Sequence, residues 1–195
     1  MDETKITKLT EKINRYLEYL EVERNVSRYT VRNYRHYLYK FTSWINQKYG
    51  DIALAKIDVE KVRQFRLFLN RHVDANNLPL MRVTQSYYLI GLRSFLKWLI
   101  KNDEPALAPE KIELPKTESR SLKFLTKQQM EQLLGQPKIS DLRGLRDKAI
   151  LEMLFSTGLR VSELTKLNHD KVNFDSREFG VIGKGNKPRV VFLSE

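Results

Sequence analysis

The sequence predicts a mainly α-helical protein: a bundle of helices, followed by a smaller α+β part with an antiparallel sheet. In roughly the first hundred residues, apolar side chains recur at the three- and four-residue steps of amphipathic helices. Near the other end, the alternating residues Phe179 and Val181 and the β-rich residues 190–193 flank a glycine-containing turn, a pattern typical of a β-hairpin. Between the two parts, over residues 102–121, the helical pattern lapses.

Four amphipathic helices are expected in the first part. The first should span residues 4–24 and the last residues 83–101. Ser27 and Asp58 are the expected N-caps of the second and third helices, because their side-chain oxygens accept hydrogen bonds from first-turn backbone N–H groups. The apolar stripes that these helices should bury are Ile6, Leu9, Ile13, Leu17 and Leu20 on the first, Val31, Tyr34, Leu38, Phe41 and Ile45 on the second, Val62, Phe65 and Leu69 on the third, and Leu89, Leu92, Phe95, Leu96 and Leu99 on the fourth.

Three prolines and a run of charged and small residues interrupt the helical pattern after the fourth helix. Pro105, Pro109 and Pro115 lie in this stretch, and proline disfavours the interior of helices and central strands. We therefore place a first domain at residues 1–103, a linker at residues 104–121 and a second domain at residues 122–195.

The second domain should contain two helices before the sheet. Thr126 and Gln129 form a capping-box pattern, and the helix that they start should turn Met130, Leu133 and Leu134 inward. A second helix is expected over residues 145–156. The segments expected to pair as a small antiparallel sheet are residues 172–174, 179–182 and 189–193.

The composition favours an anionic partner. The 195 residues carry a formal net charge of +11, and the sequence pI is about 9.7. No apolar run approaches the roughly 20 residues that a membrane span needs, so nucleic acid is a better expectation than lipid. The start, Met1-Asp2-Glu3, is acidic and polar, unlike a signal peptide. With no cysteine and only three scattered histidines, the sequence excludes disulfides, predicts no metal cluster and fits a reducing, cytoplasmic setting.

A basic face is expected on the first domain. Between Glu23 and Asp51, a stretch of 27 residues has no acidic side chain. Any one cation in it could be an ordinary solvated residue, but aligned arginines match the DNA backbone, because their planar forks fit phosphate oxygens. The side chains that line up beside the apolar stripes are Arg28, Arg32 and Arg35 with the interleaved Tyr39 on the second helix, and Arg93 and Lys97 on the fourth.

Residues 151–167 contain an arginine and a glutamate three positions apart, directly after a glycine that should stop a helix. Gly158 follows an apolar periodic run and fits a left-handed C-cap. Apolar residues then recur at three-residue steps, so a second helix should begin near Arg160 and carry Arg160 and Glu163 in its first turn. An arginine has the wrong sign for a helix N-terminus unless an anion such as phosphate also lies there. The alternative is an ordinary surface salt bridge between positions i and i+3.

Longer motifs around these residues resemble the tyrosine recombinases of the Xer and phage-integrase family. The segment Thr157-Gly158-Leu159-Arg160-Val161-Ser162-Glu163-Leu164, followed by Gly183-Lys184-Gly185-Asn186-Lys187, is a specific pair of motifs. The first part of the chain is similar to the core-binding domain of these enzymes, in residues 19–27 and again in residues 92–99. The resemblance covers nearly the whole chain.

The resemblance implies a SAM-like four-helix core-binding domain and the start of an α+β catalytic domain. It implies that Arg160 grips the scissile phosphate, that Glu163 supports this arginine, and that Lys184 protonates the leaving 5′-oxygen. For Lys184, the alternative is a solvated lysine in a glycine-rich turn. Lys187 and Arg189 are weaker candidates, expected to touch backbone phosphates or solvent.

The resemblance also implies the partners. Double-stranded DNA is the expected partner, and the complete protein would assemble as a tetramer on paired DNA sites. Residues 1–195 alone should be monomeric off DNA. No metal or other cofactor is expected, because arginine, lysine and histidine do the electrostatic work that Mg²⁺ does in other phosphoryl transferases.

Part of the family pattern is absent from these 195 residues. In the family, a His-x-x-Arg motif, a further His or Trp and the nucleophilic Tyr follow the hairpin, and none of them follows it here. All nine tyrosines lie at or before Tyr88, so the second domain offers no tyrosine nucleophile. We therefore expect a DNA-binding portion of a site-specific recombinase that does not cleave DNA by itself. The alternative is a non-catalytic DNA-binding protein that keeps the recombinase fold.

Overall fold

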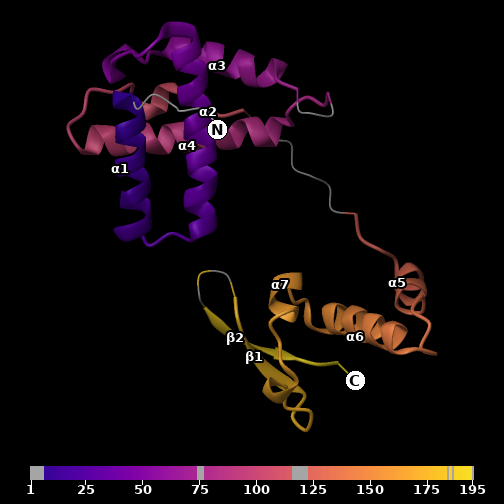
Figure 1. The fold of residues 1–195 in the computed structure, drawn as a ribbon. Coiled ribbons are helices and arrows are strands. Elements are labelled where there is room, and N and C mark those ends of the chain that lie inside the picture. Colours follow the sequence, from indigo (N-terminus) through magenta and orange to yellow (C-terminus); the bar gives the residue numbers. More distant parts are fainter. Residues whose placement is uncertain (1–6, 74–76, 116–122, 184, 186, 195) are drawn as a thin grey trace. The chain divides into compact units, whose positions relative to one another are not determined.

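The chain forms two compact units, residues 1–119 and 120–195 (Figure 1). The computed structural model describes residues 7–73, 77–115, 123–183, 185 and 187–194. The first unit is helical, and the second combines short helices with a β-hairpin, so the predicted mainly α class with a small antiparallel sheet is confirmed. Within the described residues, no helix is both long enough and apolar enough to span a membrane.

Four long helices build the first unit, as the sequence predicts. Ser27 caps α2, where its Oγ accepts a hydrogen bond from Thr30 N at 3.3 Å, and Asp58 caps α3, where its Oδ1 accepts from Lys61 N at 2.8 Å. Both predicted caps are confirmed. The elements are α1 (Lys8–Val22), α2 (Arg28–Tyr49), α3 (Val59–Arg71) and α4 (Arg82–Lys101), with short 3-10 helices at Leu54–Lys56 and Pro109–Lys111.

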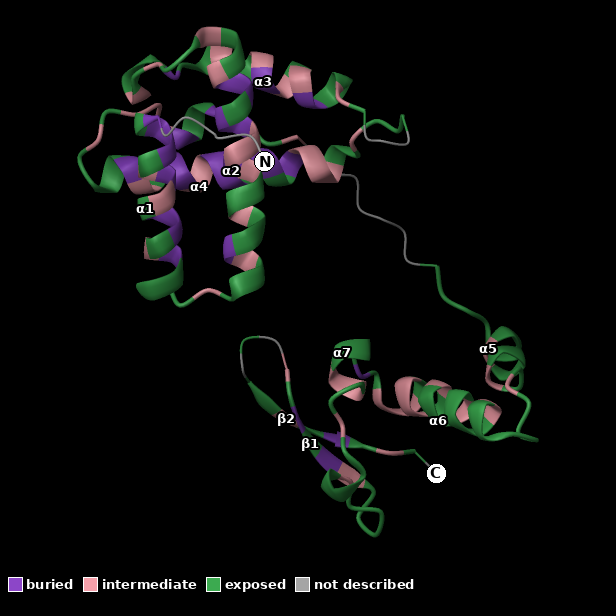
Figure 2. Ribbon diagram, in the orientation of Figure 1, coloured by how far each residue is buried: buried purple, intermediate pink, exposed green. Residues whose placement is uncertain are grey.

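The helices of the first unit bury one continuous apolar core (Figure 2). Phe65 of α3 is fully buried, and its ring centroid lies 5.0 Å from that of Phe41 and 5.2 Å from that of Trp44. Among the described residues, the predicted apolar stripes are buried except for Tyr34, which is half-buried. Ile6, also predicted to face the core, lies outside the described residues.

Gly91 lets α4 approach α2 closely. A Cβ at this position would lie 3.3 Å from the Cβ of Tyr37, which is tighter than ordinary contact. Tyr37 also packs on Tyr88 of α4, with ring centroids 4.9 Å apart. The packing of α2 on α4 therefore depends on a glycine that helical periodicity does not single out.

The core of the first unit continues beyond α4 into the proline-containing segment. Pro109 and Ile112 are buried, and Ala106 and Leu107 pack against the same core. An ion pair between Lys12 and Glu104 joins α1 to the start of this segment. Part of the stretch that sequence reasoning treats as a linker thus helps to close the helical unit.

The second unit pairs short helices with a two-stranded sheet. Thr126 and Gln129 form the predicted capping box at the start of α5. The two strands are antiparallel, with Phe179 opposite Val191. The elements are α5 (Lys127–Leu134), α6 (Leu142–Thr157), α7 (Val161–Leu164), a 3-10 turn at His169–Lys171, β1 (Glu178–Ile182) and β2 (Pro188–Phe192).

Residues 172–174 do not form the third strand that the sequence predicts, so that prediction is wrong. In this segment Asn173 alone pairs, in an isolated bridge with Glu178. The Asn173 Oδ1 accepts hydrogen bonds from the backbone N of Asp175 at 3.0 Å and of Ser176 at 3.1 Å. The side chain therefore closes a tight turn into β1 instead of continuing a strand.

The second unit buries few side chains in its described part. Those that are buried and packed together are Leu159, Phe179, Val181 and Val191. No residue of α5 or α6 is buried: Met130 and Leu134 are half-buried, and Leu133 is 42% exposed. The predicted inward position of Leu133 is therefore wrong.

Candidate active site

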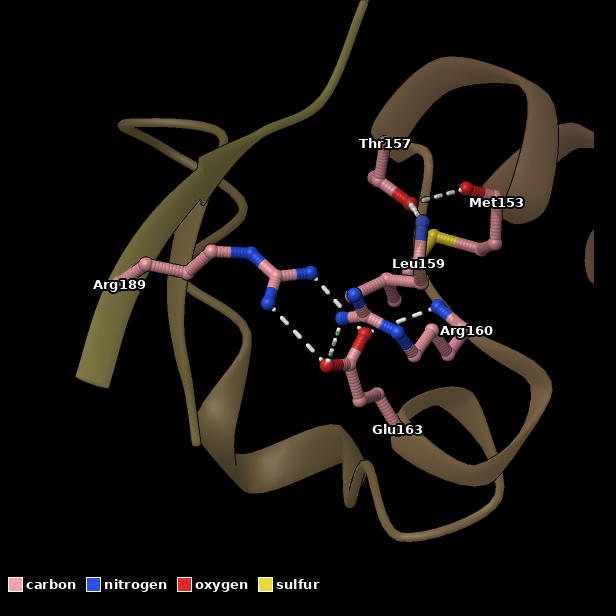
Figure 3. Close-up of polar contacts among 6 residues, drawn as sticks. All are labelled: Met153, Thr157, Leu159, Arg160, Glu163 and Arg189. Atoms are coloured by element: carbon pink, nitrogen blue, oxygen red, sulfur yellow. Dashed lines mark hydrogen bonds and ion pairs between the residues drawn. The ribbon is translucent and has the colours of Figure 1, made fainter. Parts of the chain in front are cut away.

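Gly158 places the predicted catalytic arginine just after the end of α6. Its φ of 62° lies in the left-handed region, which glycine adopts without strain, so the predicted C-cap is confirmed. The Thr157 Oγ1 donates to the Met153 carbonyl and accepts from Leu159 N at 3.3 Å, which fixes the turn (Figure 3). Leu159 is buried, and the next residue, Arg160, has a side chain that is 61% exposed.

Arg160 and Glu163 hold each other at the start of α7. Arg160 is the N-cap, one position before the helix, and not a residue of the first turn as predicted. Its backbone N donates to Glu163 Oε2 at 2.8 Å, and its Nη1 donates to Glu163 Oε1 at 3.0 Å. The i,i+3 ion pair that the sequence left open is thus present, but it engages a single nitrogen of the guanidinium.

A second arginine, Arg189 of β2, reaches the same carboxylate (Figure 3). Its Nη1 lies 3.1 Å from Glu163 Oε1 and its Nη2 lies 2.9 Å from Glu163 Oε2, a fork of two parallel hydrogen bonds. Sequence reasoning did not find this contact, which joins residues 26 positions apart. The available signal was the strand alternation, because Arg189 lies two residues before the buried Val191 and therefore on the same face of β2.

Glu163 is an ionised carboxylate surrounded by cations. Its side chain is 8% exposed. Hydrogen bonds from the Arg189 side chain, and then from the Arg160 backbone N–H, lower the pKa of Glu163 to about 2. The hydrogen bonds to Glu163 raise the pKa of Arg189 in turn. Two arginines and one carboxylate leave one net positive charge, which the more exposed Arg160 presents to solvent.

A hollow of about 700 Å³ lies beside the Arg160 side chain. Lys166 and Lys171 line it together with Arg160, and residues 180–183 form part of its wall. Among the described residues that line this hollow, Glu163 is the only acidic one, and both arginines already neutralise it. The hollow can therefore accommodate an anion such as a phosphate group.

One predicted catalytic residue, Lys184, lies outside the described residues. On the other side of the hairpin turn, Lys187 is exposed, and its carbonyl accepts a hydrogen bond from Gly183 N at 2.8 Å. The roles predicted for Lys184 and Lys187 stay predictions.

The arginines predicted to contact DNA lie exposed on α2. All three are exposed, and none of the ion pairs among the described residues includes Arg28, Arg32 or Arg35. The guanidinium groups of Arg28 and Arg32 lie 5.2 and 5.5 Å from the centroid of the Tyr29 ring. Arg35 lines a small hollow together with Glu18 and Glu21 of α1, so the positive charge of this face is least offset at Arg28 and Arg32.

The other residues predicted to contact DNA differ in exposure. Tyr39 is half-buried, and its hydroxyl donates to Asn14 Oδ1 at 2.7 Å, so it takes part in the packing of α2 on α1. Lys97 of α4 is exposed and Arg93 is half-buried. In the portion of the chain that the structure covers, no group of histidine and acidic side chains is placed to hold a metal ion.

Comparison with known proteins gives one consistent family. Residues 123–195 match the phage integrase family, and residues 13–103 match the phage integrase N-terminal SAM-like domain. The chain is 36% identical over 186 residues to the tyrosine recombinase XerC of Pelobacter propionicus, covering 95% of this chain and 60% of that protein. It is 33% identical over 177 residues to XerC of Bacillus subtilis, covering 90% of this chain and 56% of that protein. The chain thus spans 60% or less of the length of these two relatives.

Two solved structures share the fold. A Tn1549 transposon integrase in complex with circular intermediate DNA has a TM-score of 0.68 and 17% identity, covering 94% of this chain and 61% of that chain. A lambda integrase dimer bound to a core site has a TM-score of 0.67 and 17% identity, covering 94% of this chain and 48% of that chain. The fold is that of a tyrosine recombinase. Because the two family matches together take in most of the sequence, the chain belongs to the phage integrase family, with Xer recombinases among its relatives.

Proposed function

We propose that this chain carries the DNA-binding part and the first catalytic residues of a site-specific recombinase. The complete protein cleaves and rejoins DNA strands through a 3′-phosphotyrosyl intermediate. Residues 1–103 bind duplex DNA, residues 104–121 link the domains, and residues 122–195 begin the catalytic domain. The complete protein assembles as a tetramer on paired DNA sites, and residues 1–195 alone are monomeric off DNA. Membership of the family and the similarity to XerC proteins support this proposal.

The observation that carries the proposal is the state of Arg160. Its guanidinium is exposed beside a hollow lined with lysines, and Glu163, its one carboxylate partner among the described residues, is shared with a second arginine. In phosphodiester transfer, negative charge develops on the two non-bridging oxygens of the phosphate, and a planar guanidinium can donate to both. Arg160 therefore grips the scissile phosphate, and Glu163 orients it.

The remaining roles follow from the demands of the reaction. The leaving 5′-oxygen needs a proton donor, which is the role proposed for Lys184. Lys187 and the exposed arginines of α2 hold the DNA backbone, since phosphate contacts supply most of the affinity that does not depend on sequence. Arg93 and Lys97 extend this contact along α4.

One observation favours a second function. All nine tyrosines lie at or before Tyr88, so residues 89–195 contain no tyrosine that could attack the phosphate bound at Arg160. Residues 1–195 alone would then bind DNA without cleaving it, and a protein made of these residues would act by occupying sites.

The first experiment uses the 195-residue chain and a labelled duplex that carries a nick, so that a covalent intermediate is trapped. Fluorescence anisotropy at low salt should show binding, and denaturing gel electrophoresis should show no protein–DNA band. Absence of binding would overturn the DNA-binding proposal. A band that survives denaturation would show that a tyrosine of the helical unit attacks, which contradicts the proposed inactivity of this chain.

The second experiment separates the two functions. The chain is extended with the C-terminal segment of the Bacillus subtilis relative and tested on the same nicked duplex. A covalent adduct that Arg160→Ala abolishes supports the recombinase proposal. If the extended protein binds the duplex but forms no adduct, the non-catalytic function is supported.

A further inference from the structure

The contacts of Glu163 are divided unequally between its two arginines. Arg189 donates two parallel side-chain hydrogen bonds, one to each carboxylate oxygen, whereas the Arg160 side chain donates one. The fourth bond comes from the Arg160 backbone N–H. Each carboxylate oxygen thus accepts two hydrogen bonds, and an ionised carboxylate offers about four lone-pair positions in all. The acceptor capacity of Glu163 is therefore fully used.

We propose that Arg189 is a positioning residue that keeps the guanidinium of Arg160 available to an anion by occupying Glu163. The inference rests on the proposed function, in which Arg160 binds a phosphate. Arg160 and Glu163 are three residues apart and already in contact, so the two could form a fork by themselves. Such a fork would use the same edge of the guanidinium that a phosphate needs. Arg189 prevents this fork because it takes one lone pair on each oxygen.

The hairpin is built to hold Arg189 in this position. A Cβ at Gly183 would lie 2.7 Å from Arg189 Nη1 and 3.8 Å from Glu163 Oε1. A side chain at position 183 would therefore collide with the guanidinium that grips Glu163. In the antiparallel register Arg189 lies opposite Val181, which is buried, so the two side chains share a face of the hairpin, and on that face Arg189 meets Glu163 of α7.

This inference changes the role expected of Arg189 from its sequence. Two of the five N–H donors of its guanidinium are committed to Glu163, and its side chain is 38% exposed compared with 61% for Arg160. Arg160 engages one side-chain N–H in the described structure and keeps the others for a ligand. Arg189 thus acts through Glu163 on Arg160, and Arg160 contacts the phosphate.

The test is a titration of the 195-residue chain with inorganic phosphate, followed through the side-chain N–H signals of Arg160 by NMR. Arg189→Ala should weaken phosphate binding about threefold to tenfold, because a charge-assisted fork between Arg160 and Glu163 then competes with the ligand. The resolved Nη–H signals expected of a forked guanidinium should appear for Arg160 in this variant. Arg189→Lys should give an intermediate loss, because a lysine keeps the charge but cannot span two oxygens.

The decisive variant combines Arg189→Ala with Glu163→Gln. A neutral amide cannot form the competing ion pair, so the double variant should recover the phosphate affinity that Arg189→Ala loses. A double variant that stays weak would mean that Arg189 itself binds the phosphate, and unchanged affinity in Arg189→Ala would mean that it does not act on Arg160; either result overturns the inference. Arg146→Ala, which removes an exposed arginine paired with Asp147, is the charge-matched control and should change little. In Arg160→Ala, phosphate binding is followed through the backbone amide signals of α7 and the hairpin; if it is unaltered, the proposed function fails instead.

Discussion

The exposed arginines of α2 allow a quantitative test of DNA binding. The perturbation is a triple variant in which Arg28, Arg32 and Arg35 become alanine. None of the ion pairs among the described residues includes these side chains, so all three charges are available to phosphates. Each phosphate neutralised contributes about 0.9 unit to the slope of log affinity against log salt, so the triple variant should lose about 2.7 units. The ratio of the DNA affinity of the parent chain to that of the triple variant should then fall by about fortyfold between 50 and 200 mM salt.

A charge-matched control separates local contact from net charge. Lys12, Lys61 and Arg63 are paired with Glu104, Asp58 and Glu60, respectively, so their cations are already offset. Replacing all three with alanine removes the same formal charge from the chain, but it should lower the slope by less than one unit.

The assay is fluorescence anisotropy of a labelled mixed-sequence duplex over a salt series, with circular dichroism to confirm folding. The α2 variant should fold, because Arg28 stands at a helix N-terminus where its charge opposes the dipole, and alanine has high helix propensity. An unchanged slope in this variant, or an equal loss in the control, would refute the assignment of α2 to the DNA backbone.

Four further predictions concern the core, the turn and the site. Phe65→Ala should lower the free energy of unfolding of the first unit by about 3 to 5 kcal/mol. Urea unfolding followed by tryptophan fluorescence reports this unit alone, because Trp44 and Trp98 both lie in it. A loss below about 1 kcal/mol would contradict the core described above. Gly158→Ala should destabilise the turn after α6 by about 1 kcal/mol, and Gly158→Asn by less, as measured by thermal melting of the second unit; equal effects would argue against the left-handed cap. The pKa of Glu163 is about 2 compared with an ordinary 4.5, so its ion pairs should stabilise the second unit fully above pH 4.5 and cease to do so as the pH falls through about 2. The NMR signals of the hairpin amides should show this acid sensitivity in the parent chain, and the Glu163→Gln variant should not show it. In the extended protein, Arg160→Ala should slow cleavage on the order of a hundredfold on any substrate, while a 5′-bridging sulfur should rescue Lys184→Ala alone, and equal rescue of both would remove the distinction between their roles.

Local rules predicted most of the fold. Ser27, Asp58, Thr126 and Gly158 all occupy the caps expected of them, because a cap depends on a few neighbouring residues and on backbone geometry that the residue type largely sets. The sequence also predicts the apolar stripes of the first unit, because burial of one helix face makes apolar residues recur every three or four positions. The strand predicted at residues 172–174 is absent because a side chain binds the backbone N–H groups that follow it. The Asn173 Oδ1 accepts these hydrogen bonds and closes a turn where a strand was expected.

The sequence predicts only part of the contacts at the centre of the candidate site. Arg160 and Glu163 lie three residues apart, so helical spacing predicts their contact. Arg189 joins them from β2, and its position depends on the register of the hairpin. A shift of one residue would move its side chain to the opposite face of the strand. No local pattern specifies that register, so sequence reasoning assigned Arg189 to solvent or phosphate. The burial of Pro109 and Ile112 was missed for the same reason, because it depends on packing against distant helices.

The helix that leads to Arg160 has a property that matters for ligand affinity. α6 is capped by Asp141 at one end and by Gly158 at the other, yet none of its residues is buried. Amide hydrogens in such a helix become accessible to solvent through local opening of low free energy, whereas those of α4 are protected by a core. Hydrogen exchange should therefore be fast in α6 and slow in α4. A ligand that binds Arg160 slows this exchange only to the extent that it needs the last turn of α6 closed, and the free energy of closing that turn then subtracts from its measured affinity.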